Sequence, residues 1–427
     1  MARRKRKSKN HNERMNRELE NVALIKNIKV DSNSFNAGTK KMEKLFEKSQ
    51  QMKLSNKDKA KLTKDEKEAI KQGEKRYEST KGISDGSKET YLKTFERVRK
   101  EVYHKFGISD VSKITHQHTK AVIRDRIEAG QSANTIHKVV HAINFVQSVG
   151  AETGTFGENF NITDHEDTLT YLKNENISRK SADSHRYKAN ESECEKVINE
   201  LYTYKGGKYR DFADLAQLQY LSGGRRSEVI GLKSNEIHID TQKVEFNDAK
   251  GGLDNVVWGN HWTRNDTEFV TNLVNNATDG KVFRVKDSSG NYMSQEKVAE
   301  KLNTLVKRMA ERVGVGTTDK NFTSHSLRGG YAHARVTQYV KQGRSAGGLD
   351  GIIQQKIQEQ PRLQARYHAF QQHILNKSKS ENRKNREIKD YEKIQWLVSV
   401  DLNHSRQDIV RYYVDSDTIK SEIAQYE

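Results

Sequence analysis

The sequence is poor in the residues that build disulfides, rigid turns and membrane spans. It has one cysteine, Cys194, so an intrachain disulfide and a cysteine-based metal site are both excluded. That usage fits a reducing compartment. There is also a single proline, Pro361, and no apolar run reaches the roughly 18 residues of a membrane span. The start, MARRKRKSKN, is charged with no apolar stretch behind it, which argues against a secretory signal.

Positive charge is what the chain has in excess. Its 427 residues include 76 Lys and Arg against 58 Asp and Glu, a net charge of +18, and the pI is near 9.5. This balance favours a polyanionic partner, above all nucleic acid, with an anionic membrane surface as the weaker alternative. Hydrophobic residues make up 33% of the chain, which predicts a mostly helical protein with long polar faces.

The composition predicts three parts, the first of which is a basic arm over residues 1–83. This arm is rich in lysine and has few apolar anchors, so we expect it to be helical or partly disordered. Two interpretations stay open: a solvated tail, or an arm that adds contacts to DNA phosphates. Its RRKRK run would also serve as an import signal if the source is eukaryotic.

Residues 84–185 predict a small helical bundle followed by a linker. Apolar residues recur at helical spacing over 87–106, 110–130 and 132–150, and a glycine follows or closes each stretch. The stretch 151–188 loses this period and is interpreted as a loop and linker. The residues expected to face inward are Tyr91, Phe95, Val98, Val102 and Phe106 in the first helix and Ile136, Val139, Val140, Ile143 and Val146 in the third.

Residues 186–427 predict a larger domain of mixed structure. A helix, a Gly-Gly break and a new helix are expected around 211–237, and KVEFNDAKGGLDNVVW alternates around a Gly-Gly turn as a β-hairpin does. Further helices are expected near 297–314 and 326–340, and a polar helical section over 341–395 is broken at Pro361. The predicted fold class is therefore mainly α with a small β-hairpin or sheet (α+β).

Four short motifs of this domain carry residues suited to chemistry on phosphate. In chain order they are SGGRRSEV at 222–229, DAKGG at 248–252, HSLR at 325–328 and LNHSRQDIVRYY at 402–413. Their order and spacing resemble the tyrosine recombinase (phage integrase) family. That family has an Arg followed three residues later by Glu, a hairpin Lys, His-x-x-Arg, a second His, and a Tyr nine residues after it. The matching residues here are Arg225 with Glu228, Lys250, His325, Arg328, His404 and Tyr413.

The resemblance implies a core-binding domain in the helical bundle, a catalytic domain from about residue 190, and a role for each matching residue. Tyr413 would attack a DNA phosphodiester and hold the phosphate as a 3′-phosphotyrosine, so that no metal or other cofactor is needed. Arg225 and Arg328 would clamp the non-bridging oxygens. Lys250 would protonate the leaving 5′ oxygen. His325 would accept the tyrosine proton or hold the phosphate, which His404 would also contact, and Glu228 would orient Arg225.

Taken singly, each of these residues has a plainer structural interpretation. Arg225 and Glu228 could form an i, i+3 helix pair, Lys250 could be a solvated turn residue, and Tyr413 could be a core aromatic. The two histidines would each more often be structural than catalytic. The agreement of all six in order favours the functional interpretation.

The sequence departs from the family pattern in three places. Gly329 stands where a second histidine usually follows the His-x-x-Arg arginine, and Leu402-Asn403-His404 replaces Leu-Gly-His. Asn tolerates left-handed backbone nearly as Gly does, so the turn can survive. The interval from Arg328 to His404 is about fifty residues longer than expected. For this insertion, at 341–395, we slightly favour a helical hairpin on the surface over an extra DNA or protein contact, which the Lys and Arg at 377–389 would suit.

The resemblance implies a site-specific recombinase whose two domains clamp double-stranded DNA. Four copies would assemble on two sites and exchange C-terminal segments, with accessory DNA-bending proteins as further partners and no membrane. It would act in the cytoplasm of a bacterium or phage host, or in a eukaryotic nucleus. Rivals with the same chemistry are a type IB topoisomerase and a telomere resolvase. A non-catalytic DNA-binding architectural protein is the rival from another class.

Overall fold

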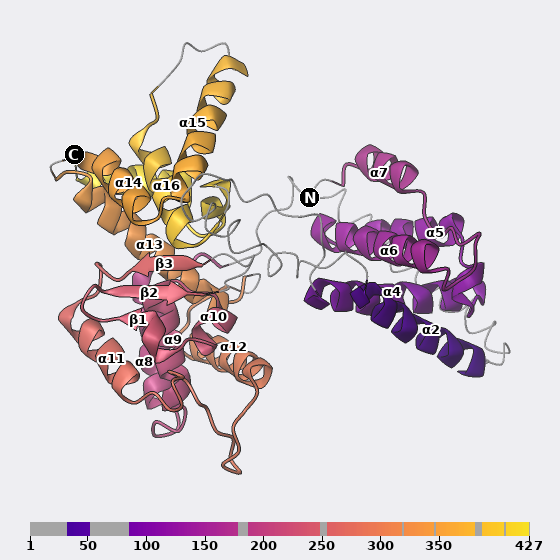
Figure 1. Ribbon diagram of the computed structural model, residues 1–427, viewed down its shortest axis with the longest axis horizontal. Coiled ribbons are helices and arrows are strands. Elements are labelled where there is room, and N and C mark those ends of the chain that lie inside the picture. The colour runs from indigo at the N-terminus through magenta and orange to yellow at the C-terminus, as the bar shows by residue number, and fades with distance from the viewer. Residues whose placement is uncertain are drawn as a thin grey trace. The chain divides into compact units, whose positions relative to one another are not determined.

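The computed structural model describes residues 32–51, 85–177, 187–247, 254–317, 320–345, 347–380, 387–404 and 407–426. These residues belong to two compact units, a smaller one that ends before residue 184 and a larger one that contains the rest. Figure 1 shows both units as ribbons. None of the helices in the described ranges is long and apolar enough to cross a membrane.

The smaller unit is a helical bundle in which α4 and α6 pack together and α2 lies against both. The inward-facing residues predicted for the third helix are all buried. In the first helix Phe95, Val98 and Val102 are buried, whereas Phe106 is 39% exposed and its ring makes a tilted contact with that of His118. The elements of this unit are α2 (Ser32–Gln51), α4 (Asp85–Phe106), η2 (Val111–Lys113), α5 (His116–Glu128), α6 (Ala133–Thr153) and α7 (His165–Asn174).

Part of the predicted arm belongs to the core of this bundle. Met42 and Leu45 of α2 are buried in the same cluster as Phe95 and Val98. The helix therefore has the apolar stripe that packs it against α4 and α6, although lysine dominates its composition.

The prediction that 151–188 lacks helices was wrong in two respects. Helix α6 runs through Gly150 and ends at Gly154, whose φ of 60° is left-handed. At Gly150 a Cβ would lie 2.6 Å from the ring of Phe160, so this glycine serves close packing and not helix termination. Helix α7 then begins at Asp164, whose side chain accepts a hydrogen bond from the Asp167 N–H.

The larger unit surrounds α13, which packs against α8, α9, α12, α14, α16 and α17. The predicted hairpin is confirmed as β2 and β3, which pair antiparallel with Val244 opposite Val257. A third strand, β1, pairs with β2 and completes a sheet of order β1-β2-β3. The fold class predicted from the sequence, mainly helical with a small sheet, is confirmed.

The elements of the larger unit, in chain order, are α8 (Glu191–Thr203), α9 (Arg210–Ser222), α10 (Arg226–Ile230), η4 (Ser234–Glu236), β1 (Ile237–His238), β2 (Lys243–Phe246), β3 (Asn255–Trp258), α11 (Arg264–Asn275), α12 (Gln295–Arg312), α13 (Ser324–Gln342), α14 (Gly348–Glu359), α15 (Leu363–Ser380), α16 (Asp390–Asp401), η5 (Gln407–Tyr412) and α17 (Ser416–Gln425).

The insertion is helical and breaks at Pro361 as expected, and its helices expose one face while the other packs into the core. Its two helices are α14 and α15, and their apolar side chains lie in the core of the larger unit. Removing these side chains from the core would leave a cavity. The buried residues are Leu349, Ile353, Ile357, Leu363, Tyr367, Phe370 and Ile374. Residues 381–386 of the Lys- and Arg-rich stretch that favoured a DNA contact lie outside the described residues.

Candidate active site

The Gly-Gly break places Arg225 at the start of α10. Helix α9 ends at Gly223, whose φ is 60° and where a Cβ would lie 2.3 Å from the Tyr331 ring, so only glycine fits. Arg225 then forms the N-cap of α10. Glu228 accepts two hydrogen bonds from it, one from the backbone N–H at 2.7 Å and one from Nη1 at 2.8 Å. This carboxylate fixes both the backbone and the guanidinium of Arg225.

Arg328 extends from the first turns of α13 and is 2% exposed. Its guanidinium donates to the backbone carbonyls of Gly223 and Leu402. Burial lowers the pKa of Arg328, with Tyr413 acting in the opposite direction. Within the described part of the chain, the buried Nε of Arg328 has no hydrogen-bond partner. The arginine is thus held by neutral carbonyls and keeps donors for an anion.

A Schellman turn at the end of α16 brings both arginines together. The Asn403 N–H donates to Val400 O at 2.8 Å and the His404 N–H to Ser399 O at 2.9 Å, which is the pattern of this motif. Asn403 has a φ of 47°, so it takes the left-handed position that glycine usually occupies. The turn leaves the Leu402 carbonyl for Arg328 and the Asn403 carbonyl for Arg225 Nη2, at 3.4 Å.

The same turn places the His404 side chain beside Tyr413. The His404 Nε2 lies 3.2 Å from the Tyr413 hydroxyl and 3.5 Å from Arg328 Nη2. Burial, reinforced by Arg328 and Arg225, lowers the pKa of His404 to about 2, so the imidazole is neutral near pH 7. Because arginine can only donate, an Nε2 lone pair suits this arrangement, and in that tautomer the tyrosine hydroxyl donates to the same atom.

Tyr413 is 3% exposed and follows η5, a 3₁₀-helix. Its ring lies 5.4 Å from that of His325 and 5.7 Å from that of His404, between centroids. The neighbouring Tyr412 is partly exposed, and its hydroxyl accepts a hydrogen bond from Arg411 at 3.3 Å. The two adjacent tyrosines therefore lie in different surroundings, and of the two it is Tyr413 that contacts His325 and His404.

Of the seven residues singled out in the sequence, the structure brings six together, and the seventh, Lys250, lies outside the described residues. A cavity of about 490 Å³ lies beside Arg225 and Glu228. It is also lined by Phe246 and Asn247, the residues that precede the undescribed turn of the hairpin.

Sequence reasoning missed a buried charge cluster behind the turn. Asp401, the last residue of α16, is fully buried and accepts hydrogen bonds from Arg335 Nε at 2.8 Å, Tyr339 Oη at 2.7 Å and Lys356 Nζ at 2.6 Å. Burial alone would raise the pKa of Asp401, but Arg335 and Lys356 outweigh it and lower the pKa to about 2. One signal was available: Arg335 follows Arg328 by seven residues, about two helical turns, and so shares its face of α13.

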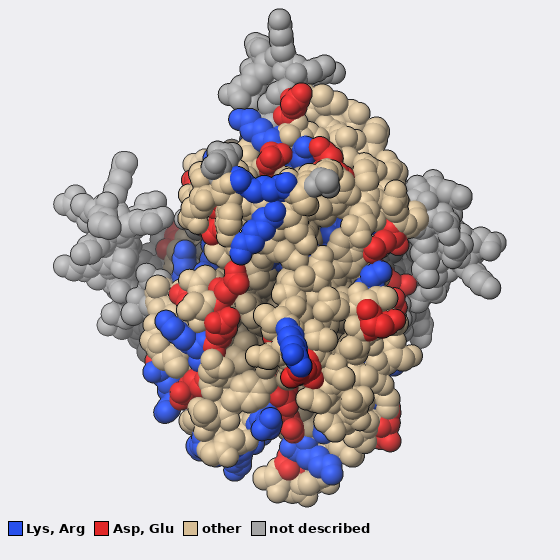
Figure 2. All heavy atoms as spheres, turned by 90° about the vertical axis from the view of Figure 1, so that its left-hand side faces the viewer, with Lys and Arg blue, Asp and Glu red and all other residues tan. Residues whose placement is uncertain are grey.

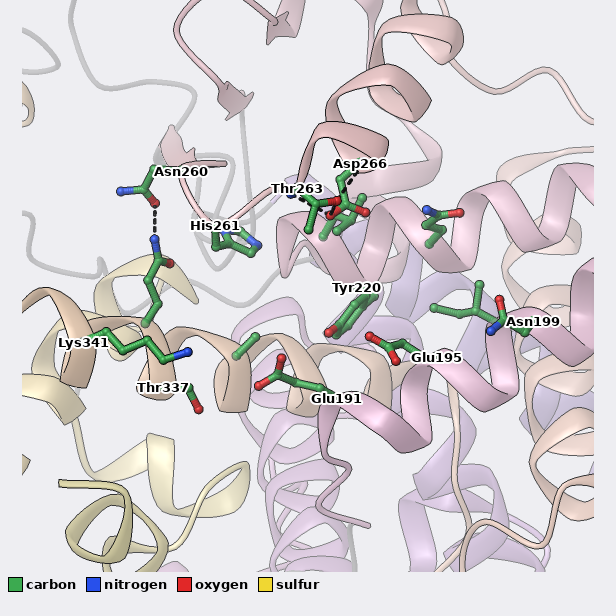
Figure 3. A pocket seen from close by; sticks show the side chains of 15 residues that line it. Glu191, Glu195, Asn199, Tyr220, Asn260, His261, Thr263, Asp266, Thr337 and Lys341 are labelled. Carbon is green, nitrogen blue, oxygen red and sulfur yellow. Dashed lines mark hydrogen bonds between the residues drawn. The ribbon is translucent and has the colours of Figure 1, made fainter. Parts of the chain in front are cut away.

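A second hollow of about 460 Å³ lies between α8, α9 and α13, away from the motif residues (Figure 3). Glu191, Glu195 and Asp266 make its wall acidic, and Gln338 donates to Asn260 at 3.2 Å at one end. This acidic lining does not suit a phosphate ligand. Within the described ranges, no group of three or more His, Cys, Asp or Glu side chains could hold a metal ion.

Charges of both signs are interspersed on the face of the larger unit that Figure 2 shows. That face offers no broad single-sign surface to a polyanion, in contrast to the arginine pair of the candidate site.

No family model and no curated protein sequence matches the chain. Solved structures are similar to it over most of its length. A lambda integrase dimer bound to a COC′ core site gives a TM-score of 0.47 at 13% identity, covering 79% of this chain and 91% of that chain. The XerH site-specific recombinase bound to palindromic difH substrate gives 0.46 at 15% identity, covering 80% and 78%. The Tn1549 transposon integrase with transposon right-end DNA gives 0.42 at 11% identity, covering 80% and 99%.

Proposed function

We propose that this chain is a tyrosine recombinase that cleaves and rejoins double-stranded DNA at a specific site through a 3′-phosphotyrosine. The observation that supports this most is that residues from three distant motifs gather around Tyr413. His404 contacts its hydroxyl, Arg328 lies over its ring and contacts His404, and Arg225 binds the turn that carries His404. Within the described residues Glu228 forms an ion pair with Arg225, and two arginines beside a tyrosine suit an anionic ligand.

In the proposed reaction the Tyr413 oxygen attacks the phosphorus, a bond from that oxygen to phosphorus forms, and the bond to the 5′ oxygen breaks. His404 would orient the nucleophile, because its neutral Nε2 lies 3.2 Å from the tyrosine hydroxyl and accepts a hydrogen bond from it, while its lowered pKa makes it a poor proton acceptor. His325, whose ring lies beside that of Tyr413, would accept the tyrosine proton or hold the phosphate. Arg225 and Arg328 would bind the non-bridging oxygens as charge builds on them.

Lys250 would give the proton that the 5′ oxygen needs. Rejoining is the reverse: a 5′ hydroxyl attacks the phosphotyrosine, and the tyrosine recovers its proton. The ester conserves the bond energy, so we expect neither ATP nor a metal to be required. As a recombinase the chain would act as a tetramer on two DNA sites, with accessory DNA-bending proteins as further partners.

The test uses a suicide DNA duplex that carries a site selected from random DNA by binding to the full chain. A nick near the cleavage point lets the cut end diffuse away, so the covalent protein–DNA adduct accumulates. We expect an adduct with the wild type and with Tyr412→Phe, the matched control, and none with Tyr413→Phe, which should still bind the duplex. Peptide mapping of the adduct should find the phosphate on Tyr413.

An adduct on any other residue would remove Tyr413 from the proposed chemistry. Binding without any adduct would favour the architectural DNA-binding protein. A map of the products then separates the catalytic alternatives: exchanged duplexes mark a recombinase, relaxed circles alone a topoisomerase, and hairpin ends a telomere resolvase.

A further inference from the structure

The insertion contributes a charged residue, Arg366, to the turn that presents His404. Arg366 lies on α15, and its Nη2 donates to Ser399 Oγ at 2.6 Å. The Ser399 hydroxyl in turn donates to the His404 carbonyl oxygen at 3.3 Å, while the His404 N–H donates back to the Ser399 carbonyl at 2.9 Å. A continuous chain of hydrogen bonds thus runs from the insertion to the backbone of His404.

The surroundings of Arg366 hold it in place without neutralising it. Its guanidinium lies 5.8 Å from the ring of the buried Trp396, and within the described part of the chain no carboxylate forms an ion pair with it. Burial and the neighbouring Arg362 lower the pKa of Arg366 to about 9. A hydrogen bond from a charged and partly buried guanidinium is stronger than one between neutral groups, so the bond from Arg366 restrains the Ser399 side chain.

The backbone position of His404 determines whether its side chain reaches Tyr413. The residue stands at the last position of the Schellman turn, where the backbone is no longer held by helical hydrogen bonds. Its Nε2 must nevertheless stay within reach of the Tyr413 hydroxyl. A displacement of about 1 Å at such a group can lower a rate about 100-fold.

We propose that Arg366 is a positioning residue for His404: through Ser399 it fixes the backbone of His404 so that Nε2 meets the Tyr413 hydroxyl. The inference rests on the proposed function for its catalytic consequence and gives the insertion a role in the active site. The groups that face His404 are Arg225, Arg328, Arg366, His325 and Tyr413, drawn from α10, α13, α15 and the C-terminal segment. Removing the Arg366 charge should therefore also raise the pKa of His404.

The first test compares variants by the rate of adduct formation on the suicide duplex at saturating protein. Arg366→Met keeps side-chain length and should slow adduct formation about 10- to 100-fold per folded molecule. Arg366→Lys, which can still donate to Ser399, should recover most of the rate. Ser399→Ala should resemble Arg366→Met, and the double variant should be no slower than either single variant.

Phe370→Ala is the matched control, because Phe370 lies one turn further along α15 and also packs against Trp396. It should lower the melting temperature more than Arg366→Met does, yet leave the rate per folded molecule unchanged. An unchanged rate in Arg366→Met, or an equal loss in Phe370→Ala, would overturn the positioning role.

The second test does not need cleavage. In the free full-length protein with isotope-labelled histidine rings, the His404 signals, assigned by their loss in His404→Gln, should shift in Arg366→Met and Ser399→Ala but not in Phe370→Ala. If the wild type forms no adduct while these signals shift, the proposed function fails and the structural link stands. If the signals do not shift, the link itself is wrong.

Discussion

In the buried cluster around Asp401, we expect removal of the negative charge to destabilise the protein far more than removal of one of the positive charges. Asp401→Asn removes the one negative charge between Arg335 and Lys356, both fully buried. Folding lowers the carboxylate pKa from 3.8 to about 2, and at 1.36 kcal/mol per pKa unit this corresponds to about 2–3 kcal/mol. Two cations are then left without a counter-ion, so we expect the full loss to reach about 3–5 kcal/mol.

Lys356→Met should behave differently. Burial lowers the pKa of Lys356 despite the attraction of Asp401, so the charged form of Lys356 is less stable here than in water. The pKa of Arg335, in contrast, is raised. Methionine removes the buried charge and leaves the Arg335–Asp401 pair intact. We expect a change within about 1 kcal/mol of wild type, in either direction. Lys420→Met, which loses only an exposed pair with Asp417, is a control expected within about 0.5 kcal/mol.

Tryptophan fluorescence is a suitable assay, because the chain's three tryptophans, Trp258, Trp262 and Trp396, all lie in the larger unit. Urea and thermal unfolding followed at these residues should show a fall of about 6–20 °C in melting temperature for Asp401→Asn. The sign with pH follows from the lowered pKa: the contribution of Asp401 is complete above about pH 4 and disappears as the pH falls toward 2. An Asp401→Asn protein within 1 kcal/mol of wild type, or an equal loss in Lys356→Met, would refute this account.

Three further predictions concern the site and the arm. Arg225→Lys should slow adduct formation at least 100-fold while DNA binding changes only a few-fold, because lysine lacks the paired donors; wild-type cleavage would take Arg225 out of the reaction. Asn403→Gly should keep or slightly raise the free energy of unfolding in urea, whereas Asn403→Ala should lower it by about 1 kcal/mol. The reason is that alanine is disfavoured at a φ of 47°. Equal values for the two variants would mean that the left-handed turn is not required. Deleting residues 1–31, which spares α2 and the bundle core, should weaken DNA binding and flatten the dependence of log Kd on log salt, and an unchanged slope would assign the arm no phosphate contacts.

Local pattern alone determined much of this protein. The Gly-Gly break before Arg225, the hairpin of β2 and β3, the helix break at Pro361 and the left-handed Asn403 all follow from what a few neighbouring residues allow. The ordered motifs likewise selected the residues that meet at Tyr413, because a reaction on phosphate needs particular side chains and the turns that present them are short.

Only the tertiary structure decided how the insertion is used. The pairing of Lys356 with Asp401 and the bond from Arg366 to Ser399 join residues 45 and 33 positions apart, and no local period marks such partners. Gly150 ended a helix in the sequence pattern, yet it lies within one because Phe160 packs against it. Lysine and arginine in a polar stretch are usually solvated. Here Lys356 is fully buried and Arg366 partly buried, because α14 and α15 pack on α16, where Lys356 pairs with Asp401 and Arg366 bonds to Ser399.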